Sequence, residues 1–280
     1  MLLNLDTKFN PTADQDQIQF ETFTFKGGEP HIKITSDLTD VEGITISHRI
    51  RSFNDLGMFI LAVDAVRRLG VKTIKAVLPY FPAARQDRVM TQGEPFTLKV
   101  FANIINACHL DEVIVYDAHS DVTPAVLDNC KSATNHNFIL NVLSHLQHQV
   151  VLVSPDGGAL KKIYKLAKAI QNIDVVECGK SRDINTGKLS GFKVFADDLK
   201  GKDLLIVDDI CDGGGTFIGL AKALKAKNAG NLYLAVSHGI FSKGMETLNK
   251  HYDHIFTTDA FSTLENTSQL TQIKLNDGLL

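Results

Sequence analysis

The stretch LLIVDDICDGGGTF, residues 204–217, decides the fold of this chain. Its first four residues are apolar, which is typical of a strand buried on both faces of a sheet. Three consecutive glycines then lead to Thr216, at which we expect a helix that continues to about Asn228. A strand, a glycine turn and a helix in this order form the repeating unit of a parallel sheet covered by helices.

The same alternation continues on both sides of this stretch. Short apolar runs predict strands at residues 75–80, 112–116, 150–153, 174–176, 204–207, 232–236 and 254–257. Amphipathic segments predict helices at residues 54–69, 97–108, 159–170 and 216–228. We therefore predict an α/β fold with two domains, each a mainly parallel sheet flanked by helices.

The polar stretch NCKSATNHN, residues 129–137, is where the two halves are expected to join. We accordingly divide the chain into residues 1–135 and residues 136–280. Ligands are expected at the carboxyl ends of the parallel strands, along a cleft that the two domains share.

Composition restricts the class of protein. The 280 residues are 44% hydrophobic and 22% charged, which is sufficient for a globular core. The net charge of -3 argues against a nucleic-acid partner but allows a local phosphate site. The spacing of the four cysteines is not that of a zinc site. We recognise neither a signal peptide nor a membrane-spanning segment in the sequence. We therefore expect a cytoplasmic protein without a membrane partner.

The glycine turn has the features of a phosphate site. The glycines at 213–215 let backbone amides approach an anion, and the helix that follows adds its positive end and the Thr216 hydroxyl. Asp208 and Asp209 could accept ribose hydroxyl protons or bind magnesium. A solvated glycine-rich loop with incidental acids is the alternative.

This loop resembles the ribose-5-phosphate motif of type I phosphoribosyltransferases and their relatives. Four more motifs occur in the order expected for one relative, the ribose-phosphate pyrophosphokinase family: PYFPAARQDR at 79–88, DAH at 117–119, SPDGG at 154–158 and KSR at 180–182. The resemblance extends from about Phe25 to the C-terminus, and ARQDR combined with the glycine loop is specific to that family. It implies two phosphoribosyltransferase type I-like domains.

The resemblance also implies an activity in nucleotide biosynthesis. Members of the family use Mg2+ and ATP, and they transfer the β,γ-diphosphate of ATP to the anomeric O1 of ribose 5-phosphate. The products are phosphoribosyl pyrophosphate (PRPP) and AMP. The family forms homo-oligomers, so we expect at least a dimer.

Carried over by position, the resemblance implies roles for individual residues. Those matched to ATP binding are Phe25, Glu29, Arg85, Gln86, Arg88 and His119. Those matched to ribose-phosphate binding are Asp208, Asp209, Asp212, Gly213, Gly214, Gly215 and Thr216. The matched magnesium ligands are His119 and Asp156, the matched catalytic lysine is Lys180, and its cationic partner is Arg182.

Residue chemistry agrees with these roles, and each role has an alternative. Guanidinium groups suit phosphate oxygens, but the arginines around Asp87 could instead form a surface ion-pair cluster. Lys180 and Arg182 on the polar loop 179–191 could close over a transferring phosphate, or they could be ordinary surface charge. The turn FKGGE could contact adenine across a subunit boundary, or its Phe25 could lie in the core.

Three departures from the family pattern bear on the acceptor and the assembly. Gly27 stands where the family usually has an aspartate that helps to recognise adenine, and Gly213 replaces the threonine of the usual DTGGT loop. Both ends are shorter than usual, so the family's hexamer and its allosteric phosphate/ADP site are not carried over. The space beside Gly213 makes ADP-ribose an alternative acceptor, as for shortened relatives associated with NAD+ salvage from nicotinamide in phages.

Two other classes remain open. A PRPP-consuming phosphoribosyltransferase shares the glycine loop but normally needs one α/β domain and no ARQDR motif. A regulatory subunit would keep the fold without catalysis, and the presence of Lys180, Arg182 and both matched metal ligands argues against it.

Overall fold

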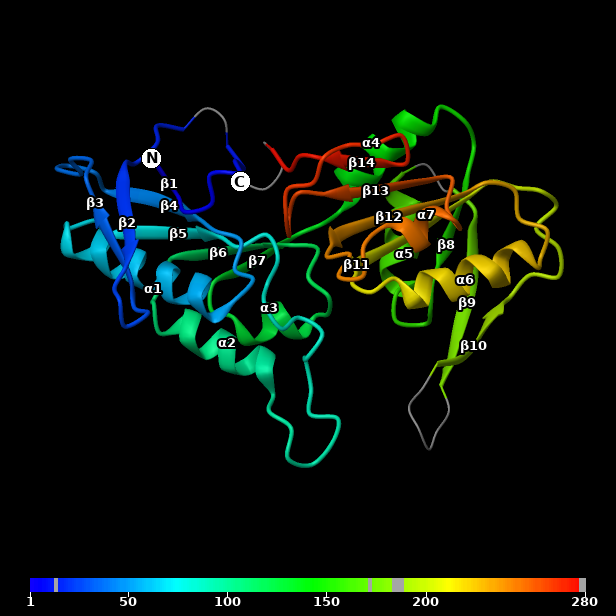
Figure 1. Ribbon diagram of the computed structural model, residues 1–280, viewed down its shortest axis with the longest axis horizontal. Coiled ribbons are helices and arrows are strands. Elements are labelled where there is room, and N and C mark those ends of the chain that lie inside the picture. The colour runs from blue at the N-terminus through cyan, green and yellow to red at the C-terminus, as the bar shows by residue number, and fades with distance from the viewer. Residues whose placement is uncertain (13–14, 171–172, 183–188, 277–280) are drawn as a thin grey trace. The chain divides into compact units, whose positions relative to one another are not determined.

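The computed structural model describes residues 1–12, 15–170, 173–182 and 189–276, with backbone alone at 181–182 and 189–190. The chain forms two compact units, each of which is described by itself (Figure 1). The first unit contains residues 1–134, residues 260–263 and the C-terminal stretch from residue 275, and the second contains residues 135–259 and 264–274. The chain thus returns to the first unit near its C-terminal end, which a division into two continuous halves does not anticipate.

The first unit is built on a parallel sheet of five strands. Their spatial order is β1 (Leu2–Asn4), β4 (Gly43–Ser47), β5 (Thr73–Val77), β6 (Glu112–Tyr116) and β7 (Cys130–Ala133). Each neighbouring pair is parallel; in β5 and β6, for example, Ala76 lies opposite Val113. The parallel α/β architecture expected from the sequence is confirmed.

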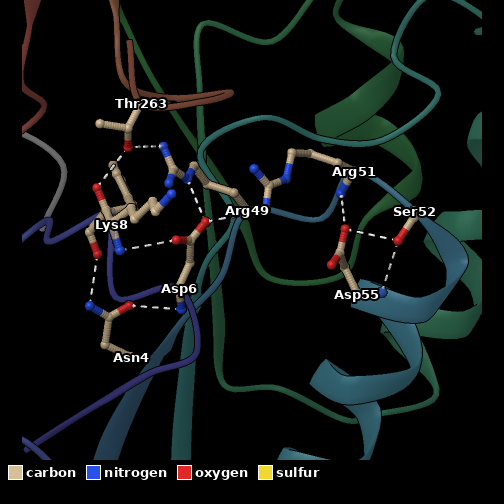
Figure 2. Close-up of polar contacts among 9 residues, drawn as sticks. Asn4, Asp6, Lys8, Arg49, Arg51, Ser52, Asp55 and Thr263 are labelled. Carbon is tan, nitrogen blue, oxygen red and sulfur yellow. Dashed lines mark hydrogen bonds and ion pairs between the residues drawn. The ribbon is translucent and has the colours of Figure 1, made fainter. Parts of the chain in front are cut away.

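Helices cover one face of this sheet (Figure 1). They are α1 (Phe53–Arg68), α2 (Thr97–Asn106) and the short α3 (Val122–Val126). Phe59 and Val63 of α1 and Phe101 of α2 are buried in one core with alternate residues of the strands. Helix α1 begins after Ser52, whose hydroxyl oxygen accepts the Asp55 amide at 3.1 Å (Figure 2).

A hairpin packs on α1. It consists of β2 (Phe20–Thr24) and β3 (Pro30–Ile34), which pair in antiparallel fashion. Ile32 is 6% exposed and joins the core of the first unit. The turn between the strands contains Gly28, whose φ of 101° lies in the region that favours glycine.

The second unit is built on a sheet of seven strands. Their spatial order is β10 (Leu189–Val194), β9 (Val175–Arg182), β8 (Val151–Ser154), β11 (Leu204–Cys211), β12 (Leu232–Gly239), β13 (His254–Thr258) and β14 (Leu270–Ile273). Strands β10 and β9 pair antiparallel, and the other neighbours pair parallel.

Helices lie on both faces of this second sheet. They are α4 (His136–Leu146), α5 (Leu160–Ala169), α6 (Gly215–Lys225) and the short α7 (Glu246–Asn249). Phe217 and Leu220 of α6 share a core with Leu204 and Ile206 of β11. Successive strand residues point to opposite faces, so Leu205 faces the other side, where α4 and α5 pack. Within the described ranges, every helix is too short or too polar to traverse a lipid bilayer.

A buried arginine ties the returning C-terminal stretch to the first unit (Figure 2). Arg49 is 1% exposed, and its Nε donates to Asp6 Oδ2 at 2.7 Å. Its Nη1 donates to the Thr263 hydroxyl at 3.1 Å, and that hydroxyl donates to the Lys8 carbonyl at 2.9 Å. Burial alone would raise the pKa of Asp6, but the hydrogen bond and charge of Arg49 lower it below its ordinary value.

We expect Asp6→Asn to lower the free energy of unfolding of the full chain by about 3 kcal/mol, because it removes the carboxylate charge that pairs with the buried Arg49 guanidinium. Urea unfolding measures the change. Asp64→Asn is the matched control, since it breaks an exposed pair with Arg68 and should leave stability nearly unchanged. Equal losses in the two variants would contradict the importance of the buried pair.

The same pair predicts a pH dependence. Because the pKa of Asp6 is lowered in the folded state, its stabilisation is present above about pH 4 and is lost as the pH falls through that lowered pKa. The difference in unfolding free energy between wild type and Asp6→Asn should therefore shrink in acid. Unfolding curves at several pH values measure it, and a constant difference would refute the linkage.

Candidate functional site

Strand β11 continues beyond the predicted end at Val207 as far as Cys211. Its parallel pairing with β12 includes Asp208, which lies opposite Val236. Asp208 and Asp209 therefore lie within the strand, whereas the strand expected from the sequence, residues 204–207, stops before them. The backbone pairing with β12 fixes both aspartates at the carboxyl end of the sheet, just before the glycine loop.

The glycine loop turns sharply into α6. Gly214 has a φ of 75°, a left-handed conformation that glycine adopts without strain. A Cβ on Gly214 would also lie 3.1 Å from the Leu248 side chain. Because Gly214 completes the turn, α6 begins at Gly215 and not at the predicted Thr216. The loop amides thus lie at the positive end of the helix, where they can donate to an anion.

A second segment, residues 240–244, is bonded to this loop, and we call it the clamp. Its first two amides donate to the Cys211 carbonyl at 2.9 and 3.1 Å. The Ser242 amide donates to the Asp212 carbonyl at 3.2 Å, and the Ser242 hydroxyl donates to the Asp212 carboxylate at 2.6 Å. The clamp therefore fixes the backbone and the side chain of the residue with which the loop begins.

Sequence reasoning missed Ser242 and Lys243 of the clamp, because no motif marks them. The signal that could have found them is the sheet itself. Loops that follow adjacent parallel strands meet at the same edge, and Cys211 at the end of β11 pairs with Gly239 at the end of β12.

Three carboxylates and a lysine lie near one another in the second unit. Burial raises the pKa of Asp208 well above its ordinary value, and the charges of Asp209 and Asp156 raise it further. Lys180 Nζ lies 3.6 Å from Asp156 Oδ2. The other oxygen of Asp156 accepts two backbone amides just before α5, at 2.9 and 3.3 Å. These bonds orient the carboxylate toward the lysine.

A magnesium ion fits this concentration of negative charge. Mg2+ is usually held by one or two carboxylates and takes its other ligands from water and substrate phosphates. Asp156 and Asp208 can supply such oxygens. No group of three or more His, Cys, Asp or Glu arranged to hold a metal occurs in the described part of the chain. A pair of carboxylates matches the number of protein ligands that Mg2+ usually takes. His119, the other predicted ligand, belongs to the first unit.

Lys180 and Arg182 lie on a two-stranded ribbon, where an open loop was predicted at 179–191. Lys180 pairs with Phe192, and Arg182 pairs with Leu189, across β9 and β10. The antiparallel backbone pairing thus extends into both flanks of the predicted loop. The Arg182 side chain and the middle of the predicted loop lie outside the described residues.

In the first unit, Asp87 joins the ARQDR and DAH motifs. Asp87 is 6% exposed, and its carboxylate accepts Arg88 Nε at 2.9 Å and Nη2 at 3.2 Å. The Arg88 hydrogen bond lowers the pKa of Asp87 against the opposing effect of burial. A hydrogen bond from Ser120 and the charge of His119 lower it further. The ion pair that the sequence left open as an alternative is therefore present for Arg88.

Arg85 and Gln86 are exposed on the turn that follows β5. The Gln86 amide donates to the carbonyl of Ala83, whose φ is 57°, at 2.8 Å. The Gln86 carbonyl accepts the Leu98 amide, at 3.2 Å, in the first turn of α2. The backbone of the turn is thus anchored to α2, while both side chains are accessible to a ligand.

The hairpin presents Phe25 to solvent. Phe25 is 52% exposed and Phe23 is 50% exposed, so the alternative that Phe25 lies in the core is wrong. Their ring centroids are 4.8 Å apart, and the His31 ring lies 4.8 Å from Phe23. A Cβ on Gly27 would lie 2.5 Å from a carboxylate oxygen of Glu29, so the turn leaves room for this exposed acid.

Comparison with known proteins gives a match for each half of the chain. Residues 5–108 match the family described as the N-terminal domain of ribose phosphate pyrophosphokinase. Residues 125–271 match the phosphoribosyl transferase domain.

Individual relatives agree with these matches. A ribose-phosphate pyrophosphokinase of Vibrio vulnificus (strain YJ016) is 30% identical over 268 residues, which cover 91% of this chain and 83% of the relative. One from Mycoplasma genitalium is 31% identical over 226 residues, which cover 79% of this chain and 67% of the relative. The crystal structure of phosphoribosylpyrophosphate synthetase from Mycobacterium smegmatis has the same fold, with a TM-score of 0.83 and 22% identity over 98% of this chain and 94% of that chain.

We expect Gly214→Ala to lower the free energy of unfolding by about 1–3 kcal/mol, because the new Cβ is strained at this φ and meets Leu248. Gly215→Ala is the control, since its Cβ would meet no atom within 4 Å. That variant should be unchanged or more stable by up to about 1 kcal/mol. Chemical unfolding of both variants measures the difference, and an equal destabilisation would contradict the special role of Gly214.

Proposed function

Because this chain belongs to the ribose-phosphate pyrophosphokinase family, we propose that it transfers the β,γ-diphosphate of ATP to the anomeric O1 of a ribose 5-phosphate moiety. With free ribose 5-phosphate the products are PRPP and AMP. The observation that supports this most strongly is the strand β11 with its acids and its clamped glycine loop, in the same unit as Lys180 and Asp156.

The glycine loop binds the 5′-phosphate of the acceptor. Amides of residues 213–215 and the Thr216 hydroxyl donate to phosphate oxygens at the positive end of α6. Asp208 and Asp209 accept hydrogen bonds from the ribose hydroxyls. These contacts orient the sugar so that O1 is presented to the nucleotide, which converts a collision of two substrates into a reaction between positioned groups.

In the transfer step, O1 attacks the β-phosphorus of ATP. A new O1–P bond forms, the bond from the β-phosphorus to its oxygen bridge with the α-phosphate breaks, and AMP leaves with that electron pair. The O1 proton is lost to solvent. Lys180, with Arg182 as its partner, neutralises the charge that builds on the phosphate oxygens. In the second unit, Asp156 would hold Mg2+ through a carboxylate oxygen, and the ion would further neutralise the diphosphate charge. His119, the other matched ligand, lies in the first unit.

We assign the nucleotide to the first unit. The proposed contacts are Arg85, Gln86, Arg88 and His119, with Phe25 and Glu29 from the hairpin of a second copy of the chain. The exposure of Phe25 supports this part of the proposal, because an exposed ring can stack on adenine. A site shared in this way requires at least a dimer.

A second acceptor, ADP-ribose, is favoured by Gly213. The family's threonine at this place would carry a hydroxyl and a methyl beside the 5′-phosphate, and glycine carries neither group. The product would be ADP-ribose pyrophosphate, which can be condensed with nicotinamide in NAD+ salvage. A PRPP-consuming phosphoribosyltransferase is less well supported, because residues 5–108 match the N-terminal domain of ribose phosphate pyrophosphokinase.

Incubation of the purified chain with ATP, Mg2+ and a panel of ribose phosphates tests the proposal. We expect AMP release that depends on the acceptor, together with an acceptor heavier by one diphosphate group in the mass spectrum. Ribose 5-phosphate and ADP-ribose are compared as acceptors, and ribose without phosphate is the control. The absence of AMP release with every acceptor, or consumption of PRPP with a nucleobase, would refute the diphosphokinase assignment.

Lys180→Ala should lower kcat by at least about 100-fold, because it removes charge stabilisation that is realised mainly in the transition state. Circular dichroism should report an unchanged fold, since Lys180 is 19% exposed and its ion pair with Asp156 is 3.6 Å long. Lys165→Ala, on the exposed side of α5, is the control and should keep its turnover. Turnover of Lys180→Ala within threefold of wild type would remove Lys180 from the mechanism.

A further inference from the structure

The side chain of Lys243 lies along the glycine loop. A Cβ on Gly213 would be 3.4 Å from Cδ and Cε of Lys243 and 3.6 Å from its Cγ. Three consecutive carbons of the lysine therefore pass beside Gly213, and the ammonium is one C–N bond, about 1.5 Å, beyond Cε. This positive charge is thus held next to the loop that we assign to the 5′-phosphate.

The backbone of the clamp keeps Lys243 in this place. Ser242, the residue before it, is bonded to Asp212 through both its amide and its hydroxyl. The Gly244 amide donates to the Phe241 carbonyl at 2.8 Å, which closes a tight turn around Lys243. Lys243 is exposed, so its charged end can meet a ligand that enters from solvent.

Gly213 and Lys243 are complementary in shape. A Cβ alone on residue 213 would already reach van der Waals contact with the lysine carbons. The further atoms of a threonine would extend into the space beside that Cβ, and the two side chains would compete for it. Glycine in the loop therefore leaves the room that the lysine occupies, and a loop hydroxyl is replaced by a cation.

The charge of Lys243 suits a second phosphate. The loop amides and the positive end of α6 can hold one phosphate without a side-chain cation. A further phosphate joined to the first adds negative charge close to Asp212, which the clamp holds beside Lys243, so it needs a positive partner. A lysine ammonium on a flexible stem binds phosphate as a point charge and does not require one fixed geometry.

We propose that Lys243 holds the second phosphate of acceptors whose ribose 5-phosphate is esterified as a diphosphate, and that it selects these acceptors over free ribose 5-phosphate. The inference rests on the proposed function, because it assumes that the glycine loop binds the 5′-phosphate. ADP-ribose belongs to this class of acceptor and is the probe.

Lys243→Met tests the inference, because it keeps the apolar stem and removes the charge. The measured quantity is the ratio of kcat/KM for ADP-ribose to kcat/KM for ribose 5-phosphate. We expect this ratio to fall at least tenfold in Lys243→Met. The matched control is Lys222→Met, which removes the same charge from the last turn of α6 and should keep the wild-type ratio. A ratio that is the same in Lys243→Met and wild type would overturn the inference.

Gly213→Thr provides a second variant that acts on the same pair. It should lower the ratio in the wild-type background, because threonine displaces the lysine stem. In the Lys243→Met background the threonine should lower the ratio much less, because the charge is already absent. Equal effects of Gly213→Thr in the two backgrounds would contradict the coupling between Gly213 and Lys243.

The outcomes separate this inference from the proposed function. Turnover of ribose 5-phosphate with ADP-ribose inert would overturn the inference and leave the diphosphokinase assignment intact. If AMP is not released from ATP with any acceptor, the diphosphokinase assignment fails. The affinity of the chain for each acceptor, measured by calorimetry, then tests the inference. A preference of the wild type for ADP-ribose over ribose 5-phosphate that Lys243→Met loses at least tenfold would then support it, and equal affinities in wild type and variant would overturn it.

Discussion

The parallel pairing of β11 with β12 is the constraint on which the candidate site of the second unit depends. It keeps Asp208 in extended backbone, ends where the glycine loop begins, and brings together the two segments that follow the strands. The bonds from the clamp to Cys211 and Asp212 form at that junction. The shape of the glycine loop is therefore a property of the sheet and its register, and not of the glycines alone.

The pKa values of Asp87 in the first unit and Asp208 in the second unit are shifted in opposite directions. In the first unit, Asp87 is neutralised within the chain by Arg88, which lowers its pKa. In the second unit, Asp208 is half-buried near Asp209 and Asp156, and its pKa is raised. A carboxylate that is paired with an arginine of the chain fixes the loops around it. Carboxylates that repel one another instead bind a cation or a hydroxyl donor more readily. The first arrangement suits a scaffold, and the second suits a binding site that is completed by its ligands.

Much of this structure could be predicted from the sequence, for identifiable reasons. Strands such as β11 and β12 are buried on both faces, so they appear as continuous apolar runs. The short edge strand β1 and the helix α4, which begins inside a polar stretch, carry no such signal. The glycine loop was located by its residue types, but Lys243 was not, because contact across adjacent strands leaves no local pattern. The surroundings of Phe25 were undecided because alternation along a hairpin strand defines two faces without saying which is covered.

The return of residues 260–263 to the first unit limits how this chain can be divided into fragments. Thr263 shares the hydrogen bonds of Arg49, and the ring of Phe261 lies 5.1 Å from that of Tyr80. A recombinant fragment that stops at the middle of the chain would lack Thr263 and Phe261. In such a fragment the Arg49 guanidinium would be more exposed to water than in the intact protein. The halves are therefore not interchangeable modules, and shuffling them between relatives would have to transfer this distant stretch together with the first half.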